Sequence, residues 1–134
     1  MKTVFTVGVY DLLHFGHVEL FRKAKALGDR LVVAVQSSEA VEKYKPQSPA
    51  INNTDIRMYM VKAIKYVDDV VVYQDVDQIV QEVPFDIFVA GGDQSHEGFR
   101  RAIAWCEAHG KQVIHLPRTE GISSSEIKEH IKNL

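Results

Sequence analysis

The chain has 134 residues, the size of one ordinary domain and too short for a second hydrophobic core. Apolar residues make up 46% and charged residues 25%, a mixture that excludes an intrinsically disordered chain. Sixteen basic and eighteen acidic residues give a formal net charge of -2. This balance excludes a broad cationic surface for a nucleic acid polymer, so any phosphate binding is expected to be local.

The cysteine content and the apolar stretches indicate the compartment. Cys106 is the single cysteine, so no disulfide forms within the chain and a reducing environment is expected. The longest apolar stretches are far too short to cross a bilayer, and residues 1–3 lead directly into a strand-like segment rather than a signal peptide. We therefore expect a cytoplasmic protein without membrane insertion.

Strand-like and helix-like segments alternate along the sequence. Short runs rich in β-branched and aromatic residues predict strands at residues 3–8, 30–36, 69–73, 86–90 and 111–116. Apolar residues at helical spacing predict helices at residues 17–27, 39–43, from 53 or 54 onward, 76–83, 97–109 and 123–132. In the helix that begins at residue 53 or 54, the apolar side is expected to hold Ile56, Met60 and Ala63 or Ile64.

This alternation, with connections too long for hairpins, predicts a single α/β domain over residues 1–134 with an open parallel sheet of five strands and helices on both faces. Such sheets bind ligands at the carboxyl ends of their strands, near the point where the strand order reverses. The loops that lead from strands into helices are therefore the first place to look for a site.

The loop after the first predicted strand holds the pattern His14-x-Gly16-His17, with Asp11 three residues before it. Two imidazoles, a glycine that allows close backbone approach and the start of a helix together favour an anion. We interpret this loop as a phosphate-binding site. The alternative is that His14 and His17 only cap or pack against the helix.

A second loop, residues 117–125, joins the last predicted strand to the last predicted helix. Arg118 offers a planar cation with several donors, and Gly121 and the serines that follow precede another helix start. This pattern predicts a second contact with phosphate, although a capped helix with a surface arginine would look the same.

The two loops together resemble the HxGH cytidylyltransferases. The resemblance rests on GVYDLLHFGH at residues 8–17 and RTEGISSS at residues 118–125, and it extends over the whole chain. Within that family the sequence is most similar to the bacterial glycerol-3-phosphate cytidylyltransferases. The resemblance implies a Rossmann-like fold, a homodimer, and a reaction that joins CTP to a phosphorylated alcohol and releases pyrophosphate, in the synthesis of cell-wall or capsule precursors.

The resemblance also implies roles for individual residues. His14 and His17 would contact the triphosphate and support the transition state, helped by Arg118. A lysine of the following loop, Lys43 or Lys45, would reach substrate phosphates. The residues expected along the nucleotide are Gly8, Val9, Tyr10, Asp11, Gly16, Asp93, Thr119, Gly121, Ile122, Ser123 and Ser124.

The acceptor and the metal are defined less closely. Arg57 and Lys65 match positions at which the family binds phosphate, but Lys65 stands where the family has an arginine. A second departure, at residues 91–94, makes His96 a further candidate for the acceptor. Mg²⁺ is the expected cofactor, and Asp11 is its candidate protein ligand.

The predicted reaction is a single in-line displacement, because neither loop contains a nucleophile. Glycerol 3-phosphate is the first choice of acceptor. The alternatives are the same chemistry with ethanolamine phosphate, ribitol phosphate or a sugar phosphate, the same chemistry with ATP, and a nucleotide-binding module without turnover.

Overall fold

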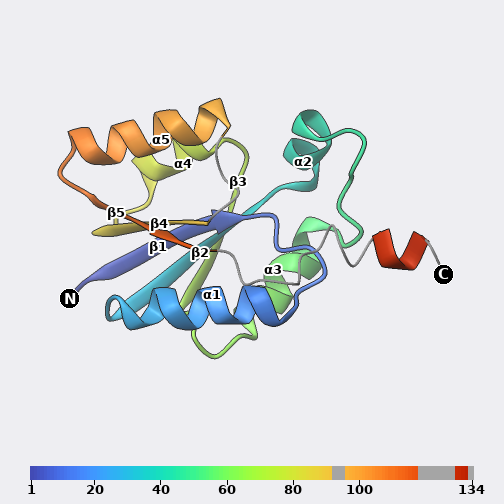
Figure 1. Cartoon of the computed structure of the whole chain (residues 1–134), viewed down its shortest axis with the longest axis horizontal. Helices are drawn as coiled ribbons and strands as arrows, with labels where there is room; N and C mark the ends of the chain where they lie inside the picture. The colour runs from blue at the N-terminus through green and yellow to red at the C-terminus, as the bar shows by residue number, and fades with distance from the viewer. Residues whose placement is uncertain (92–95, 118–128, 133–134) are drawn as a thin grey trace.

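Five strands pair in parallel to form one sheet, as Figure 1 shows. The structure is a computed structural model that describes residues 1–91, 96–117 and 129–132. Its strands are β1 (Thr3–Gly8), β2 (Arg30–Gln36), β3 (Asp69–Tyr73), β4 (Ile87–Gly91) and β5 (Gln112–Leu116). The predicted α/β fold with a parallel five-stranded sheet is confirmed.

The strand order β3-β2-β1-β4-β5 places β1 at the centre. The chain moves outward from β1 through β2 to β3 and then returns to the other side of β1 with β4. The strand order therefore reverses between β1 and β4, and the carboxyl ends of these two strands mark the expected ligand site.

Helices cover both faces of the sheet. The chain forms α1 (Phe15–Ala26), α2 (Ser38–Tyr44), α3 (Thr54–Lys62), α4 (Val76–Glu82) and α5 (Glu97–Ala108). In Figure 1, α1 and α3 lie on one face, α4 and α5 lie on the other, and α2 stands beyond the carboxyl ends of the strands.

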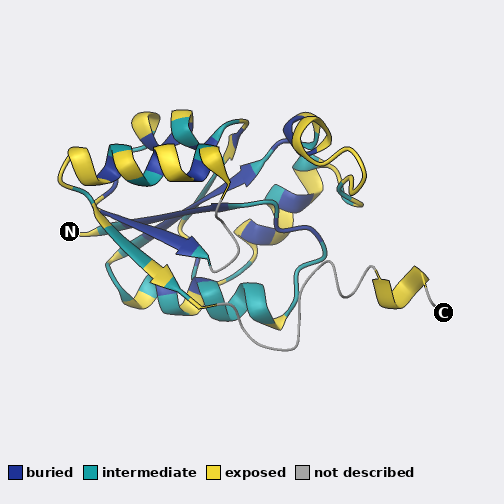
Figure 2. Cartoon of the chain, turned by 45° about the horizontal axis from the view of Figure 1, so that its top comes forward, coloured by how far each residue is buried: buried dark blue, intermediate teal, exposed yellow. Residues whose placement is uncertain are grey.

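Because side chains alternate along each strand, the sheet supplies two separate cores. On the α4 and α5 face, Phe5 and Phe88 pack with Val80 and Phe99. On the α1 and α3 face, other side chains of the same strands pack in a second cluster, which includes Phe21 of α1 and Val61 of α3. Figure 2 shows the result: the central strands β1, β2 and β4 are buried, the edge strands β3 and β5 are partly exposed, and the outer sides of the helices are exposed.

Most boundaries agree with the sequence to within one residue, but α1 begins two residues earlier than predicted. Residue His14 is its N-cap, so Phe15 is already helical. The side chain of His14 caps the backbone, and this makes a start before Gly16 and His17 favourable. Of the predicted last helix, residues 129–132 are helical and the remainder lies outside the described residues.

The predicted apolar side of α3 is wrong for Ile56 and Met60, although Ile64, just after the helix, does pack against the core. Ile56 and Met60 are 46% and 45% exposed, whereas the buried residues of this helix are Arg57 and Val61. The reason is that Arg57 points inward and bonds backbone carbonyls there, which outweighs the apolar preference of the neighbouring positions.

In the described part of the chain, the longest helices, α1 and α5, have 12 residues each, and none is both long and apolar enough to cross a membrane. About 20 apolar residues would be needed for a helix to span the hydrocarbon core.

Gly28, which follows α1, lies so close to the segment around Lys2 and Val4 that a side chain at residue 28 does not fit. A Cβ atom at this position would stand 2.8 Å from the carbonyl oxygen of Lys2 and 2.8 Å from Cγ2 of Val4. We expect Gly28→Ala to lower the free energy of unfolding by about 1–3 kcal/mol, because backbone atoms must shift. Urea unfolding followed by circular dichroism measures this loss.

The matched control is Gly98→Ala. Its nearest neighbour is the ring of His96 at 3.3 Å, a side chain that can move, and alanine favours the helix. Equal losses for the two variants would contradict the assignment of Gly28 to a backbone contact.

Candidate active site

The loop between β1 and α1 leaves the centre of the sheet at its carboxyl edge, beside β4. This places His14 and His17 at the point where the strand order reverses. The location matches the expectation from the sequence, and Figure 1 shows the loop at the end of β1 that faces α2 and α3.

His14 and His17 close the start of α1 by a reciprocal capping box. Nδ1 of His14 accepts from the backbone N–H of Gly16 at 3.0 Å, and Nδ1 of His17 accepts from the backbone N–H of His14 at 3.3 Å. The two rings stack with their centroids 3.9 Å apart. The alternative interpretation, in which the two histidines cap the helix, is therefore correct as far as it goes. The capping bonds use only one nitrogen, Nδ1, of each ring.

These bonds fix the tautomer of both rings. A neutral imidazole that accepts at Nδ1 must carry its proton on Nε2, so each ring is an Nε2–H donor. Burial first and the neighbouring His14 second lower the pKa of His17 to about 4, although Asp11 opposes the shift. At neutral pH His17 is thus an uncharged donor whose orientation is set by the helix start.

The ring of Tyr10 packs against the ring of His17. The tyrosine ring makes an edge contact with His17 at a centroid distance of 5.5 Å and another with Phe21 at 5.0 Å. A Cβ atom on Gly8 would stand 2.7 Å from Cζ of Tyr10, so this ring position requires glycine at residue 8. Tyr10 and Leu12 both have left-handed backbone, with φ of 54° and 52°. Such strain in non-glycine residues concentrates at functional loops.

Asp11 is buried and faces a different loop. Its Oδ2 accepts from the N–H of Ile51 at 2.6 Å and its Oδ1 accepts from the N–H of Asn52 at 3.0 Å. The described residues contain no group of three His, Cys, Asp or Glu side chains that could hold a metal ion. The protein atoms described thus form no cage for Mg²⁺, and both carboxylate oxygens of Asp11 serve the backbone.

Arg57 is also buried, at 1% exposure. Its guanidinium donates to the carbonyls of Asn52, Val9 and Gln36 at 2.7–2.9 Å and to Oγ of Ser38 at 3.0 Å. These contacts differ from the acceptor-binding role that the sequence predicted. A guanidinium committed to four oxygens of its own chain has little left to offer a substrate.

The remaining basic candidates fall into two places. Lys45 ends α2 at the carboxyl edge, and its charge lowers the pKa of His96, after the larger effect of burial. His96 caps α5, where its Nδ1 accepts from the N–H of Phe99 at 3.3 Å. Lys43 is exposed and lies over the ring of Tyr44.

Lys65 is not brought to this site. It lies over the ring of Tyr66 in the turn between α3 and β3, which is at the amino ends of the strands. A substrate on His14 and His17 of the same chain is therefore out of its reach, and the predicted acceptor role does not fit the position.

Several predicted contacts lie outside the described residues. They are Asp93, Arg118, Thr119, Gly121, Ile122, Ser123 and Ser124. Gly16 and Val9 are described: the N–H of Gly16 serves the ring of His14, and the carbonyl of Val9 serves Arg57. Both groups thus help to shape the loop, and the contact of these residues with the nucleotide stays a prediction.

Sequence reasoning missed the role of the backbone at Ile51 and Asn52, which meets Asp11 and Arg57. The sequence predicted only a loop over residues 44–53. The available signal was an arginine four residues before Val61, on the side of α3 that faces the sheet.

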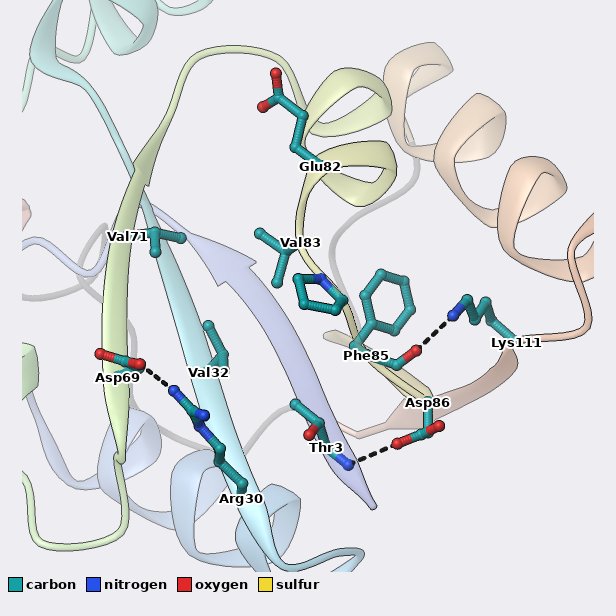
Figure 3. Close-up of a pocket in the computed structure, with 11 residues that line it drawn as sticks. Thr3, Arg30, Val32, Asp69, Val71, Glu82, Val83, Phe85, Asp86 and Lys111 are labelled. Carbon is teal, nitrogen blue, oxygen red and sulfur yellow. Dashed lines mark hydrogen bonds and ion pairs between the residues drawn. The ribbon is translucent and has the colours of Figure 1, made fainter. Parts of the chain in front are cut away.

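A separate open pocket of about 440 Å³ lies at the amino edge of the sheet, as Figure 3 shows. Four of its charged side chains make contacts within it. Arg30 pairs with Asp69, Lys111 donates to the carbonyl of Phe85, and Asp86 accepts from the N–H of Thr3. This pocket contains none of the predicted site residues.

Comparison with known proteins identifies the family. The cytidylyltransferase-like family matches residues 5–130. The chain belongs to this family. It is 39% identical to glycerol-3-phosphate cytidylyltransferase of Bacillus subtilis, over the full length of both chains. It is 38% identical to the protein of the same name from Staphylococcus aureus, over 98% of this chain and 96% of that one.

A solved structure supports the same assignment of the fold. The lipopolysaccharide core biosynthesis protein from Thermoplasma volcanium matches with a TM-score of 0.72 and 27% identity, over 89% of this chain and 97% of that chain. The resemblance inferred from the two loops is thus confirmed. As a member of the cytidylyltransferase-like family, the protein is a nucleotidyltransferase, and the predicted enzyme class is confirmed.

The lowered pKa of His17 makes stability depend on pH. Unfolded, His17 takes up a proton below its ordinary pKa of 6.5, whereas the folded protein resists protonation down to about 4. Between these values the unfolded state binds more protons, so the free energy of unfolding falls as the pH is lowered. From pH 7 to pH 5 we expect His17 to contribute a loss of about 2 kcal/mol.

Urea unfolding of the wild type and of His17→Gln at both pH values checks this contribution. Glutamine does not titrate. The free energy of unfolding of the wild type minus that of His17→Gln should therefore be lower at pH 5 than at pH 7. A constant difference would show that His17 has an ordinary pKa in the folded state.

Proposed function

We propose that the protein transfers the cytidylyl group of CTP to glycerol 3-phosphate, which yields CDP-glycerol and pyrophosphate. The observation that carries this proposal is the pair of Nε2–H donors, His14 and His17, fixed at the start of α1 at the switch point of the sheet. The names of the two bacterial relatives support the choice of glycerol 3-phosphate.

The proposed step is one displacement at the α-phosphorus of CTP. A phosphate oxygen of the acceptor forms the new P–O bond, and the bond to the oxygen that bridges the α- and β-phosphorus breaks, so pyrophosphate leaves. A phosphate monoester with a second pKa near 6 is already largely dianionic at neutral pH. No general base is required, which agrees with a site built from donors.

The protein contributes position and hydrogen bonds. The Nε2–H groups of His14 and His17, beside the N-terminus of α1, would meet the negative charge that grows on the triphosphate as the bridging bond breaks. We assign Lys43, Lys45 and Arg118 to the same charge. Donors that are already oriented need no reorganisation during the reaction, and this lowers the barrier.

Mg²⁺ is proposed as the ion that accompanies CTP and neutralises part of its charge. It retains several waters and few protein ligands in such sites. Because both oxygens of Asp11 accept from the backbone, we expect the triphosphate and water to supply most of its ligands. With a single cysteine, Cys106, that is buried and free, we also propose a cytoplasmic location.

Removing either histidine should lower turnover without unfolding the protein. We expect His14→Ala and His17→Ala each to reduce kcat by about a hundredfold or more, as for other donors that act in the transition state. Initial rates of pyrophosphate release measure the effect, and circular dichroism checks the fold. A folded variant with wild-type turnover would remove that histidine from the mechanism.

The acceptor and the nucleotide are tested in the same assay. CTP and ATP are each combined with glycerol 3-phosphate, ethanolamine phosphate, ribitol phosphate and a sugar phosphate. The proposal requires the highest kcat/KM with CTP and glycerol 3-phosphate. CTP binding without pyrophosphate release for any acceptor would instead indicate a nucleotide-binding module.

We also propose that two copies of the chain associate through α3. Ile56, Tyr59 and Met60 lie on one side of this helix and are 45–77% exposed. An apolar stripe of this kind on a short helix favours contact with another apolar surface. A second copy is the occupant that the family resemblance implies, which accounts for apolar residues on the exposed side of α3.

A charge placed in this stripe should separate the copies. We expect the wild type to sediment as a species with twice the molar mass of one chain. Tyr59→Glu should sediment as a single chain, because burying an unpaired carboxylate at an interface is costly. Sedimentation velocity measures both. The control is Ile131→Glu, an exposed apolar residue on another segment, which should leave the mass unchanged. A wild type with the mass of one chain would contradict the proposal.

A further inference from the structure

We infer that Arg57 and Asp11 are positioning residues of the reaction, which fix the loop at residues 45–53 against the loop between β1 and α1. Arg57 also donates to Oγ of Ser38, the first residue of α2. Through these contacts the two side chains set the place of Lys43, in the last turn of α2, and Lys45, its C-cap, relative to His14 and His17; because both lysines lead into the loop, they are called the loop lysines. This inference rests on the proposed function, in which those lysines bind substrate phosphate. Neither positioning residue needs to touch a substrate.

The first observation is that the end of the loop is held from two directions. Asn52 donates its N–H to Oδ1 of Asp11 at 3.0 Å, and its carbonyl accepts from Nε of Arg57 at 2.9 Å. Ile51 donates its N–H to Oδ2 of Asp11 at 2.6 Å. Three backbone groups of two consecutive residues are thus bound by two buried side chains.

The second observation is that Arg57 also reaches the other loop. One nitrogen of its guanidinium, Nη1, donates to the carbonyl of Val9 at 2.9 Å and to the carbonyl of Gln36 at 2.7 Å. Val9 belongs to the segment that leads to Asp11 and His14. The same cation therefore contacts both loops and the end of β2, and only a planar group with several donors can do this.

The third observation concerns the other end of the loop. The N–H of Lys45 donates to the carbonyl of Val41 at 2.7 Å, and the buried Ala40 and Val41 anchor α2. The loop thus runs from the C-cap of α2 to the backbone groups that Asp11 and Arg57 bind.

Packing does not hold the segment between these two ends. Residues 42–49 are exposed, so this stretch adds little to the core. Tyr44 donates its hydroxyl to Asp75, and the rest of the stretch follows from where its ends are bound, one of them by Asp11 and Arg57. A buried arginine that bonds carbonyls of three segments is costly to lose, since each carbonyl would then be left without a partner.

A double-mutant cycle tests this inference by kinetics. The variants are Arg57→Lys, a variant with both loop lysines replaced (Lys43→Ala, Lys45→Ala), and their combination. Lysine keeps the charge of Arg57 but cannot bond three carbonyls and a hydroxyl at once. The measured quantities are kcat and KM for CTP and for the acceptor, with circular dichroism as the check of the fold.

We expect removal of the loop lysines to raise one KM about tenfold or more in the wild-type background and less than about twofold in the Arg57→Lys background, because the two changes act through one loop. The matched control, Arg30→Lys at the amino edge, should leave the lysine effect unchanged. Equal effects of lysine removal in the wild-type and Arg57→Lys backgrounds, or no effect in the wild type, would overturn the inference.

Hydrogen exchange gives a readout that needs no activity. In Arg57→Lys and in Asp11→Asn, the amides of Ile51 and Asn52 should exchange about tenfold faster or more than in the wild type. The amide of Leu31, which donates to Asp68 at the amino edge at 2.7 Å, should exchange at its wild-type rate. Unchanged exchange at Ile51 and Asn52 would overturn the inference.

The two proposals fail in different ways. If the wild type releases no pyrophosphate with any pair of substrates, the proposed function fails, while the exchange rates still report on the two buried side chains. If Arg57→Lys does not fold, Asp11→Asn takes its place in the cycle with the same expected loss of the lysine effect.

Discussion

The start of α1 depends on an exchange of hydrogen bonds in which each histidine of the motif caps the backbone next to the other. The first N–H groups of a helix have no partners within it, so some acceptor must be found for them. Here the acceptors are the Nδ1 atoms of His14 and His17. The same two bonds that satisfy the helix therefore decide which nitrogen keeps the proton, and structure and chemistry use opposite sides of each ring.

The rest of the carboxyl edge is arranged around this helix start. Tyr10 fits beneath His17 only because Gly8 has no side chain and because the backbone accepts a left-handed conformation. Asp11 then turns toward the loop after α2, where its two oxygens accept from Ile51 and Asn52. One short segment, residues 8–17, thus contains the two histidine donors, the tyrosine that packs against His17 and the aspartate that binds the loop after α2.

The sequence predicted the sheet and the location of the site, because those features depend on local patterns. Buried parallel strands such as residues 30–36 appear as continuous apolar runs, and the motif at His14 and His17 marks one particular loop. What could not be predicted depends on contacts between distant segments. The inward side of α3 is fixed by Arg57 and carbonyls up to 48 residues away, so helical spacing of apolar residues alone selected the wrong side.

The same dependence on distant contacts explains why Lys65 and Arg57 do not lie where the sequence predicted. Lys65 was assigned by its place in a motif, but the turn before β3 lies at the amino edge, where a site at the carboxyl ends cannot use it. Arg57 was assigned to the acceptor because it stands where the family has an arginine in the helix after the loop. Its burial shows that a cation within a motif can equally serve the backbone, and sequence spacing does not distinguish the two uses.

The cations at this edge also differ in how they respond to ionic strength. Dissolved salt screens exposed charges such as Lys43 and Lys45, whose attraction for phosphate weakens as the Debye length shortens. A guanidinium sealed beneath the surface, like that of Arg57, is screened far less. High salt would then weaken the binding of the substrate phosphates, while the loops that Arg57 holds together keep their arrangement.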